Sequence, residues 1–120
     1  MLASERAAGI AAAKTKIAGE TGVSQLGERL AAGEVIIIDG AMGTELQRRG
    51  VPMDKVAWSA AAIASHPDTI REIHEDYIRA GAEVIIANTF GAARHVLARA
   101  SLGERVGELN RRAVHQQPCQ

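Results

Sequence analysis

The chain has 120 residues, and its 14 Lys and Arg residues balance 14 Asp and Glu residues. A chain without a basic surplus lacks the charge that nucleic-acid binding requires, and no apolar run approaches the roughly 18 residues of a membrane span. With only one Trp, one Tyr and one Phe, the core has to come from Ile, Val, Leu and Ala, which favours α/β or helical packing over an aromatic-rich β-sandwich.

The two ends of the chain differ from its middle in composition. Residues 1–23 are rich in Ala with scattered Gly and Lys, and we expect a disordered leader because such a segment has no apolar face to pack. The single cysteine, Cys119, excludes a disulfide within the chain, and this cysteine usage fits a reducing compartment. We therefore expect a cytoplasmic protein that binds neither nucleic acid nor a membrane.

Two runs of β-branched residues predict two strands. Residues 35–39 and 83–88 are apolar without alternation, which is typical of strands buried on both faces of a parallel sheet. Between them, Pro67 at a first helical position and Gly81 after a last one predict a helix over 67–80. Parallel strands need such a crossover, so this order predicts a right-handed βαβ unit.

The crossover helix should bury one apolar face. Ile70, Ile73, Tyr77 and Ile78 follow helical spacing, and His74 beside them is expected to make a local hydrogen bond. Shorter helices are predicted from Ser24 to a stop at Gly33, and over 44–49, 60–64, 91–100 and 104–115.

The loop after the first strand carries the strongest candidate for a binding site. Asp39 stands at the carboxyl end of the strand, where parallel α/β folds bind ligands, and its carboxylate suits an ammonium group. Gly40 and Gly43 let the backbone turn with its amides exposed, and such amides attract an anion such as a carboxylate. One loop could thus hold both charged groups of an amino acid. The alternative is a tight turn in which Asp39 caps the next helix.

Two further places are candidates for the same site. Asn88, Thr89 and Phe90 follow the second strand, so their polar groups should face the same mouth; the alternative is a turn in which Asn88 or Thr89 caps the next helix. Trp58 either forms a wall of the site or plugs the end of the core.

Several motifs in order along the chain resemble the homocysteine S-methyltransferase family, which includes betaine–homocysteine methyltransferase and the homocysteine module of cobalamin-dependent methionine synthase. The resemblance covers about Leu26 to Val114. The residues that carry it are Val35–Leu46, Trp58, His66–Ala82, Asn88–Ala92 and Glu108–Asn110.

The resemblance implies a (β/α)8 barrel, which typically takes about 250 residues, so we expect this chain to hold the first two βα units of an incomplete α/β barrel. The expected domains are a leader over 1–23, a partial homocysteine-binding barrel over 24–115, and a tail over 116–120 that departs from the family pattern. The implied substrate-binding residues are Asp39 for the ammonium, the backbone of Gly40, Ala41 and Met42 for the carboxylate, and Trp58, Asn88, Thr89 and Phe90 at the mouth.

The implied reaction is methyl transfer to the homocysteine thiol, giving methionine. The family uses zinc held by three cysteine thiolates on late barrel strands, and Cys119 precedes any third strand, so it is not carried over as a ligand. We expect no catalytic or metal-binding residue in this chain, which alone should be inactive. We also expect copies of the chain to associate through their open barrel edges. The alternatives are a non-catalytic remnant that binds a partner and a small amino-acid-binding module. The methyl donor is not specified by these residues.

Overall fold

The computed structural model describes residues 22–115, which fall into two compact units, 22–37 and 38–115. The predicted tail and all of the predicted leader except its last two residues lie outside this range. The predicted domain limits therefore stay predictions.

The first unit is one helix and an extended segment. Helix α2 (Gly22–Ala31) begins two residues before the predicted cap, Ser24. It is followed, as predicted, by Gly33 in the left-handed region at φ 81°, which glycine adopts without strain. The Arg29 guanidinium pairs with the Glu34 carboxylate at 2.7 Å, so this turn is held by a local ion pair.

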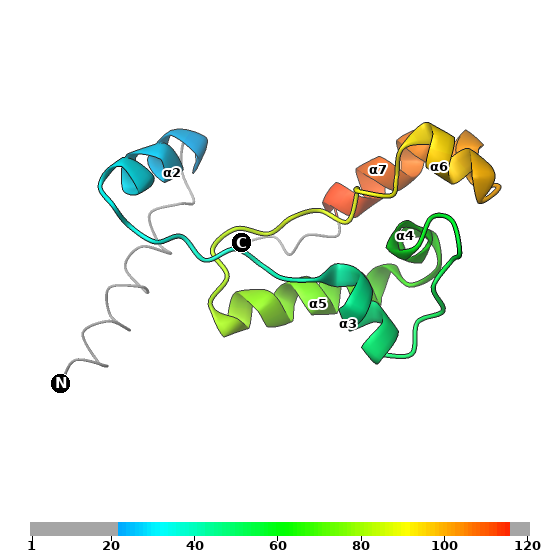
Figure 1. The fold of residues 1–120 in the computed structure, drawn as a ribbon, viewed down its shortest axis with the longest axis horizontal. Helices are drawn as coiled ribbons and strands as arrows, with labels where there is room; N and C mark the ends of the chain where they lie inside the picture. The colour runs from blue at the N-terminus through cyan, green and yellow to red at the C-terminus, as the bar shows by residue number, and fades with distance from the viewer. Residues whose placement is uncertain (1–21, 116–120) are drawn as a thin grey trace. The chain divides into compact units, whose positions relative to one another are not determined.

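The second unit consists of several short helices and one longer helix (Figure 1). In chain order they are α3 (Met42–Arg48), the 3-10 helix η1 (Ser59–Ala61), α4 (Ala62–Ser65), α5 (Pro67–Ala80), α6 (Arg94–Arg99), the 3-10 helix η2 (Gly103–Arg105) and α7 (Val106–His115). Helices α3 and α4 pack on α5, α4 also contacts α7, and η2 contacts both α6 and α7. No helix between residues 22 and 115 is long and apolar enough to cross a bilayer.

Helix α5 follows its local signals closely. Pro67 occupies the first position, where its missing N–H costs nothing, and Gly81 ends the helix at φ 113°. Ile70 and Ile73 are fully buried as predicted, whereas Tyr77 and Ile78 are only partly buried. The core therefore packs against the apolar stripe in the first half of the helix and less closely against its second half.

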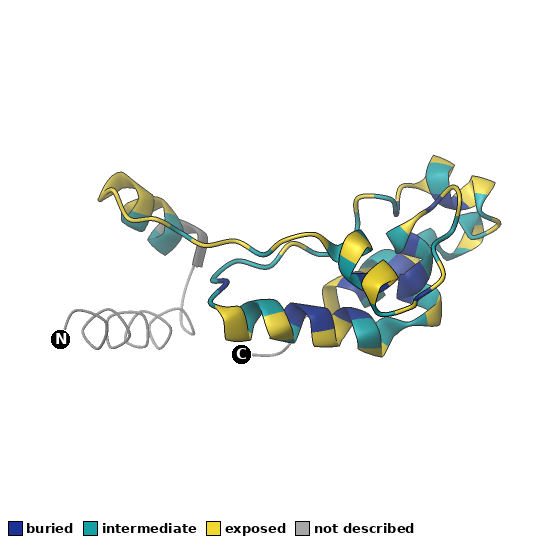
Figure 2. Cartoon of the chain, turned by 60° about the horizontal axis from the view of Figure 1, so that its bottom comes forward, coloured by how far each residue is buried: buried dark blue, intermediate teal, exposed yellow. Residues whose placement is uncertain are grey.

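The apolar core belongs to the second unit (Figure 2). Its largest fully buried apolar side chains are Leu46, Ile63, Ile70, Ile73, Leu97 and Leu109. They come from α3, α4, α5, α6 and α7, and small alanines fill the spaces between them. This core positions α3 and α5, the two helices that flank the Asp39 loop.

The two predicted strands meet at a single point. Ile38 and Val84 form one parallel bridge, in which the Asp39 backbone N–H donates to the Val84 carbonyl at 3.0 Å. The parallel sense agrees with the prediction, but no longer strand forms within residues 22–115. The predicted burial on both faces was wrong, because none of the apolar side chains of 35–38 and 84–87 is buried. Val35, Ile37, Ile38 and Ile86 are all more than half exposed, because no neighbouring strand covers them.

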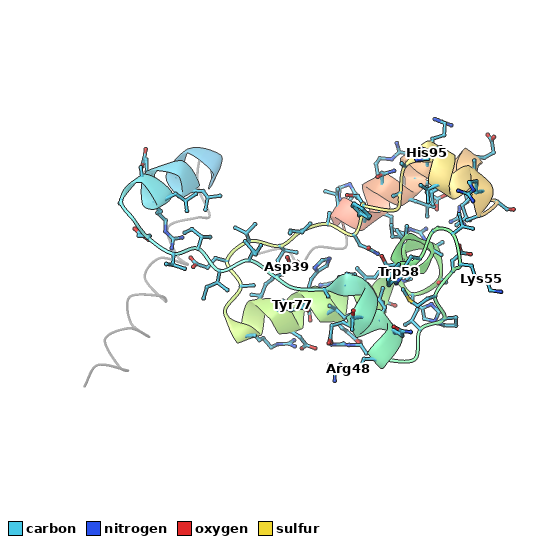
Figure 3. All side chains as sticks on the ribbon, in the orientation of Figure 1. Asp39, Arg48, Lys55, Trp58, Tyr77 and His95 are labelled. Carbon is cyan, nitrogen blue, oxygen red and sulfur yellow. The ribbon has the colours of Figure 1, made fainter. Side chains whose placement is uncertain are left out.

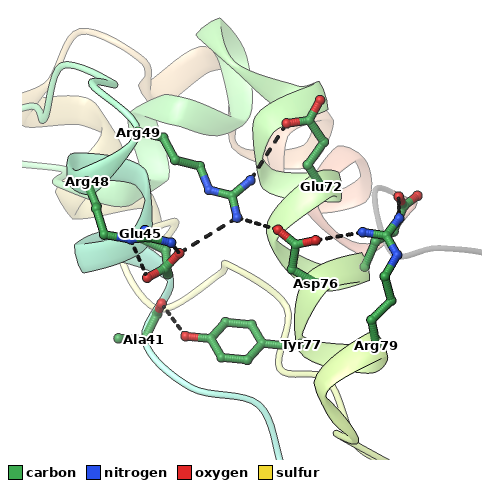
Figure 4. Close-up of polar contacts among 9 residues, drawn as sticks. Ala41, Glu45, Arg48, Arg49, Glu72, Asp76, Tyr77 and Arg79 are labelled. Carbon is green, nitrogen blue, oxygen red and sulfur yellow. Dashed lines mark hydrogen bonds and ion pairs between the residues drawn. The ribbon is translucent and has the colours of Figure 1, made fainter.

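A charged network joins α3 to α5 (Figure 4). The Arg49 guanidinium contacts Asp76 at 2.6 Å, and it lies 3.7 Å from both Glu45 and Glu72. Its hydrogen bond is the main cause that lowers the pKa of the Asp76 carboxyl. Since Arg49 follows the last residue of α3 and the acidic partners Glu72 and Asp76 stand on α5, the network fixes the position of one helix on the other.

Candidate binding site at the Asp39 loop

Asp39 is held by the segment that bridges to it. Its Oδ2 atom accepts a hydrogen bond from the Ile86 backbone N–H at 2.9 Å, and its side chain is 3% exposed. Its Oδ1 atom is buried and has no hydrogen-bond partner among residues 22–115. The turn-cap alternative for Asp39 was wrong, because the carboxylate bonds across the chain to Ile86, and Ala41 is the N-cap residue of α3.

The turn after Asp39 lies close to α5. The Tyr77 hydroxyl donates to the Ala41 carbonyl at 3.0 Å, and a Cβ added at Gly40 would lie 2.7 Å from the Tyr77 hydroxyl oxygen. Glycine at position 40 therefore permits this close approach. Helix α3 begins at Met42, two residues earlier than predicted, and Ala41 makes no side-chain cap bond to its first turn.

Trp58 is held in an unusual backbone conformation. Its φ of 45° lies in the left-handed region, which costs a non-glycine residue on the order of 1–3 kcal/mol. The Asp54 side chain supports the turn by accepting from the Val56 and Ala57 N–H groups, both at 2.7 Å. The Trp58 side chain is 60% exposed, so the core-plug alternative was wrong.

The indole of Trp58 lies against the start of α3. A Cβ added at Gly43 would be 2.9 Å from Trp58 Nε1. A methyl group there would force the indole away, so Gly43 and Trp58 fit each other. This contact brings one predicted wall residue to the loop that carries Asp39.

Asn88 joins the second predicted loop to the residue after Trp58. It is buried, its Nδ2 donates to the Ser59 carbonyl at 2.8 Å, and its Oδ1 accepts from the Ser59 hydroxyl at 2.9 Å. Asn88 does not cap the next helix, because the N-cap of α6 is Ala93. Asn88 is therefore a clamp between two loops, and its amide is already engaged.

Thr89 is partly buried and Phe90 forms the exposed part of this turn. The Thr89 carbonyl accepts from the Ala92 N–H at 2.9 Å, which closes a tight turn, and Phe90 is fully exposed. A Cβ added at Gly91 would lie 2.8 Å from the Ala57 carbonyl oxygen. Glycine thus lets this turn lie directly on the segment that carries Trp58.

Residues 57–60 are the link between the two predicted loops. They contact the first loop through Gly43 and the second through Asn88 and Gly91. In Figure 3 the labelled residues Asp39 and Tyr77 lie near each other, and Trp58 lies apart from both, beside α4. Among the described residues, no hydrogen bond joins Asp39 to Trp58 or Asn88, so the two loops and Trp58 are linked through the scaffold of residues 57–60.

Ser59, His74 and Tyr77 are part of this arrangement but carried no distinct signal in the sequence. His74 and Tyr77 stand three residues apart on one face of α5, and both meet the segment 39–41. The expected local hydrogen bond of His74 was wrong, because neither ring nitrogen has a partner among residues 22–115. In that range no three His, Cys, Asp or Glu side chains gather as a metal-binding group.

The Asp39 carboxylate lies directly after a parallel bridge and beside a glycine-containing turn, which corresponds to the strand ends where α/β folds place their ligands. The chain belongs to the homocysteine S-methyltransferase family, because the model of that family matches residues 36–117. The match includes every predicted site residue.

Relatives of this family are similar over the same part of the chain. Homocysteine S-methyltransferase 4 of Zea mays is 40% identical over 85 residues, which are 70% of this chain and 25% of that protein. Homocysteine S-methyltransferase of Escherichia coli K12 is 39% identical over 71 residues, 59% of this chain and 23% of that protein. Selenocysteine methyltransferase of Astragalus bisulcatus is 38% identical over 84 residues, which are 69% of this chain and 25% of that protein. The chain thus spans about a quarter of the length of these relatives. No solved structure matches it significantly.

Proposed function

We propose that this chain forms part of the homocysteine-binding site of a homocysteine S-methyltransferase, which transfers a methyl group to the homocysteine thiol and gives methionine. The observation that carries the proposal is the Asp39 carboxylate. Its side chain is almost completely buried, one oxygen is fixed by the Ile86 N–H, and the other has no partner among the described residues. A buried carboxylate is costly without a partner, and a substrate ammonium would supply that partner.

The rest of the amino-acid backbone would be bound by the same turn. The amides of Gly40, Ala41 and Met42 precede or open α3, whose first turn has no side-chain cap, and free amides favour a carboxylate. Trp58 and Phe90 are exposed aromatic rings that would cover the aliphatic part of homocysteine. Asn88 and Thr89 would shape the mouth, Asn88 through its bonds to Ser59.

The parallel bridge supports the first two βα units of a (β/α)8 barrel. In such a barrel each strand has two neighbours, and further strands would cover the side chains of Val35, Ile37, Ile38 and Ile86 that are exposed here. A barrel therefore accounts for the apolar character of both segments, which the single bridge does not.

The residues of this chain do not fit the zinc site that the family implies. That site takes three thiolates, and the sequence contains one cysteine, Cys119, which lies outside the described residues. No metal-binding group forms within residues 22–115. The proposal for this chain is therefore confined to the amino-acid backbone of the substrate and derives no step at its sulfur.

Titration calorimetry with two matched ligands tests the proposal. L-Homocysteine carries the ammonium, whereas 4-mercaptobutyrate keeps the thiol and the carboxylate without it. A hydrogen bond to a charged group contributes about 1.5–3 kcal/mol, so homocysteine should bind about ten- to a hundredfold more tightly. Equal binding of 2-aminobutyrate, which lacks the thiol, would favour a general amino-acid-binding module. Absence of binding to all three ligands would favour a non-catalytic remnant that contacts a partner.

A further inference from the structure

Three buried polar atoms without partners belong to two neighbouring side chains. They are Oδ1 of Asp39 and both ring nitrogens of His74, none of which has a hydrogen-bond partner among residues 22–115. The His74 side chain is completely buried, and its Nδ1 atom lies 3.9 Å from Asp39 Oδ2. Buried polar groups are paired in nearly all proteins, and each exception calls for an explanation.

The backbone around this gap is already fixed on both sides. Tyr77, one helical turn after His74, donates to the Ala41 carbonyl, and the Ile86 N–H holds Asp39 Oδ2. Helix α5 thus presents two polar side chains, three residues apart, to the segment 39–41. An N–H···O bond spans about 2.7–3.2 Å, so a movement of about 1 Å would join His74 to Asp39.

We propose that His74 is a positioning residue, whose Nδ1–H donates a hydrogen bond to Asp39 and orients its carboxylate toward the ammonium of the amino-acid substrate. The inference rests on the proposed function for the role of Asp39. His74 would then donate a hydrogen bond from α5 to Asp39, as Tyr77 donates one from α5 to Ala41. With Oδ2 held by His74 and Ile86, Oδ1 is left to the substrate.

The neutral donor is the form that suits this site. Burial lowers the pKa of His74, although the nearby Asp39 carboxylate opposes that shift. A neutral imidazole carries one N–H, on either nitrogen, and the hydrogen bond selects which. Pairing with Asp39 selects Nδ1, which leaves Nε2 as an unprotonated, buried acceptor.

The pairing is tested in the 120-residue chain by nuclear magnetic resonance of the imidazole nitrogens. We expect His74 to carry its proton on Nδ1 and the tautomer to change in the Asp39→Ala variant. A proton on Nε2, or ring signals that the Asp39 substitution leaves unchanged, would overturn the inference. This readout requires no ligand and no activity.

The role in binding is tested by two variants of similar size. His74→Asn keeps a donor near the position of Nδ1, whereas His74→Leu removes it. Homocysteine affinity should stay within about threefold in His74→Asn and fall about tenfold in His74→Leu; equal loss in both would overturn the positioning role. If the wild-type chain shows the Nδ1–H tautomer but binds no homocysteine, the pairing stands and the proposed function fails.

Discussion

Replacing Asn88 with alanine removes both hydrogen bonds that join the 88–91 turn to Ser59. Each bond contributes about 0.5–1.5 kcal/mol to stability. The Ser59 carbonyl still accepts the backbone N–H of Ala62 after this change, so the cost comes from the two lost bonds themselves. Because Asn88 is buried and both its bonds are short, at 2.8 and 2.9 Å, we expect a total loss of about 1–3 kcal/mol. That is a large part of the 5–15 kcal/mol that typically stabilises a domain.

Ser59→Ala is the matched control for this change. It removes only the hydroxyl bond and keeps the bond from Asn88 Nδ2 to the backbone carbonyl, so we expect it to cost about 1 kcal/mol. Urea unfolding followed by circular dichroism gives both values, and the double variant gives the coupling between them. An Asn88→Ala variant no less stable than Ser59→Ala would refute the clamp and return Asn88 to the role of a free substrate contact.

Three further predictions follow from the charges and the exposed surface. Arg49→Met should lower the free energy of unfolding at neutral pH and low salt. The difference in stability between this variant and wild type should shrink as pH falls below about 4, because Arg49 stabilises only the ionised Asp76 carboxylate, whose pKa is lowered. A difference that is the same at pH 2 and pH 7 would contradict the network. The lowered pKa of His74 should make the chain lose stability as pH falls below about 6.5, the pKa of histidine in the unfolded chain. His74→Leu should remove this part of the pH dependence of stability. An unchanged pH profile in that variant would contradict the prediction. The exposed apolar residues of 35–38 and 86 should make the chain associate, which sedimentation and melting at several concentrations would detect; a concentration-independent melt of a clean monomer would contradict this.

The sequence predicts best those elements whose signals are local. Pro67 and Gly81 bracket α5, and Glu75, at i, i+4 spacing from both Arg71 and Arg79, pairs with each at 3.2 Å. These features depend on neighbours within one or two helical turns, so spacing is sufficient to predict them. The parallel sense of the Ile38–Val84 bridge was also predictable, because a helix separates the two segments.

What the sequence missed depends on contacts between distant parts of the chain. A run of β-branched residues indicates a strand, but a ladder needs neighbouring strands, and beyond the bridge 35–39 and 83–88 have none among residues 22–115. Asn88 and Ser59 are 29 residues apart, and nothing in either segment indicates their pairing. The strained backbone of Trp58 likewise accompanies the Asp54 turn and the contact with α3, which no propensity encodes.

The most direct test of the central claim is the homocysteine affinity of the Asp39→Asn variant, measured beside wild type and Asp68→Asn. Both variants remove one negative charge, but Asp68 is an exposed residue in the first turn of α5. If Asp39 binds the substrate ammonium, Asp39→Asn should weaken binding about ten- to a hundredfold, and Asp68→Asn should leave it unchanged. Equal affinity in wild type and Asp39→Asn would contradict the assignment of Asp39 and, with it, the proposed site.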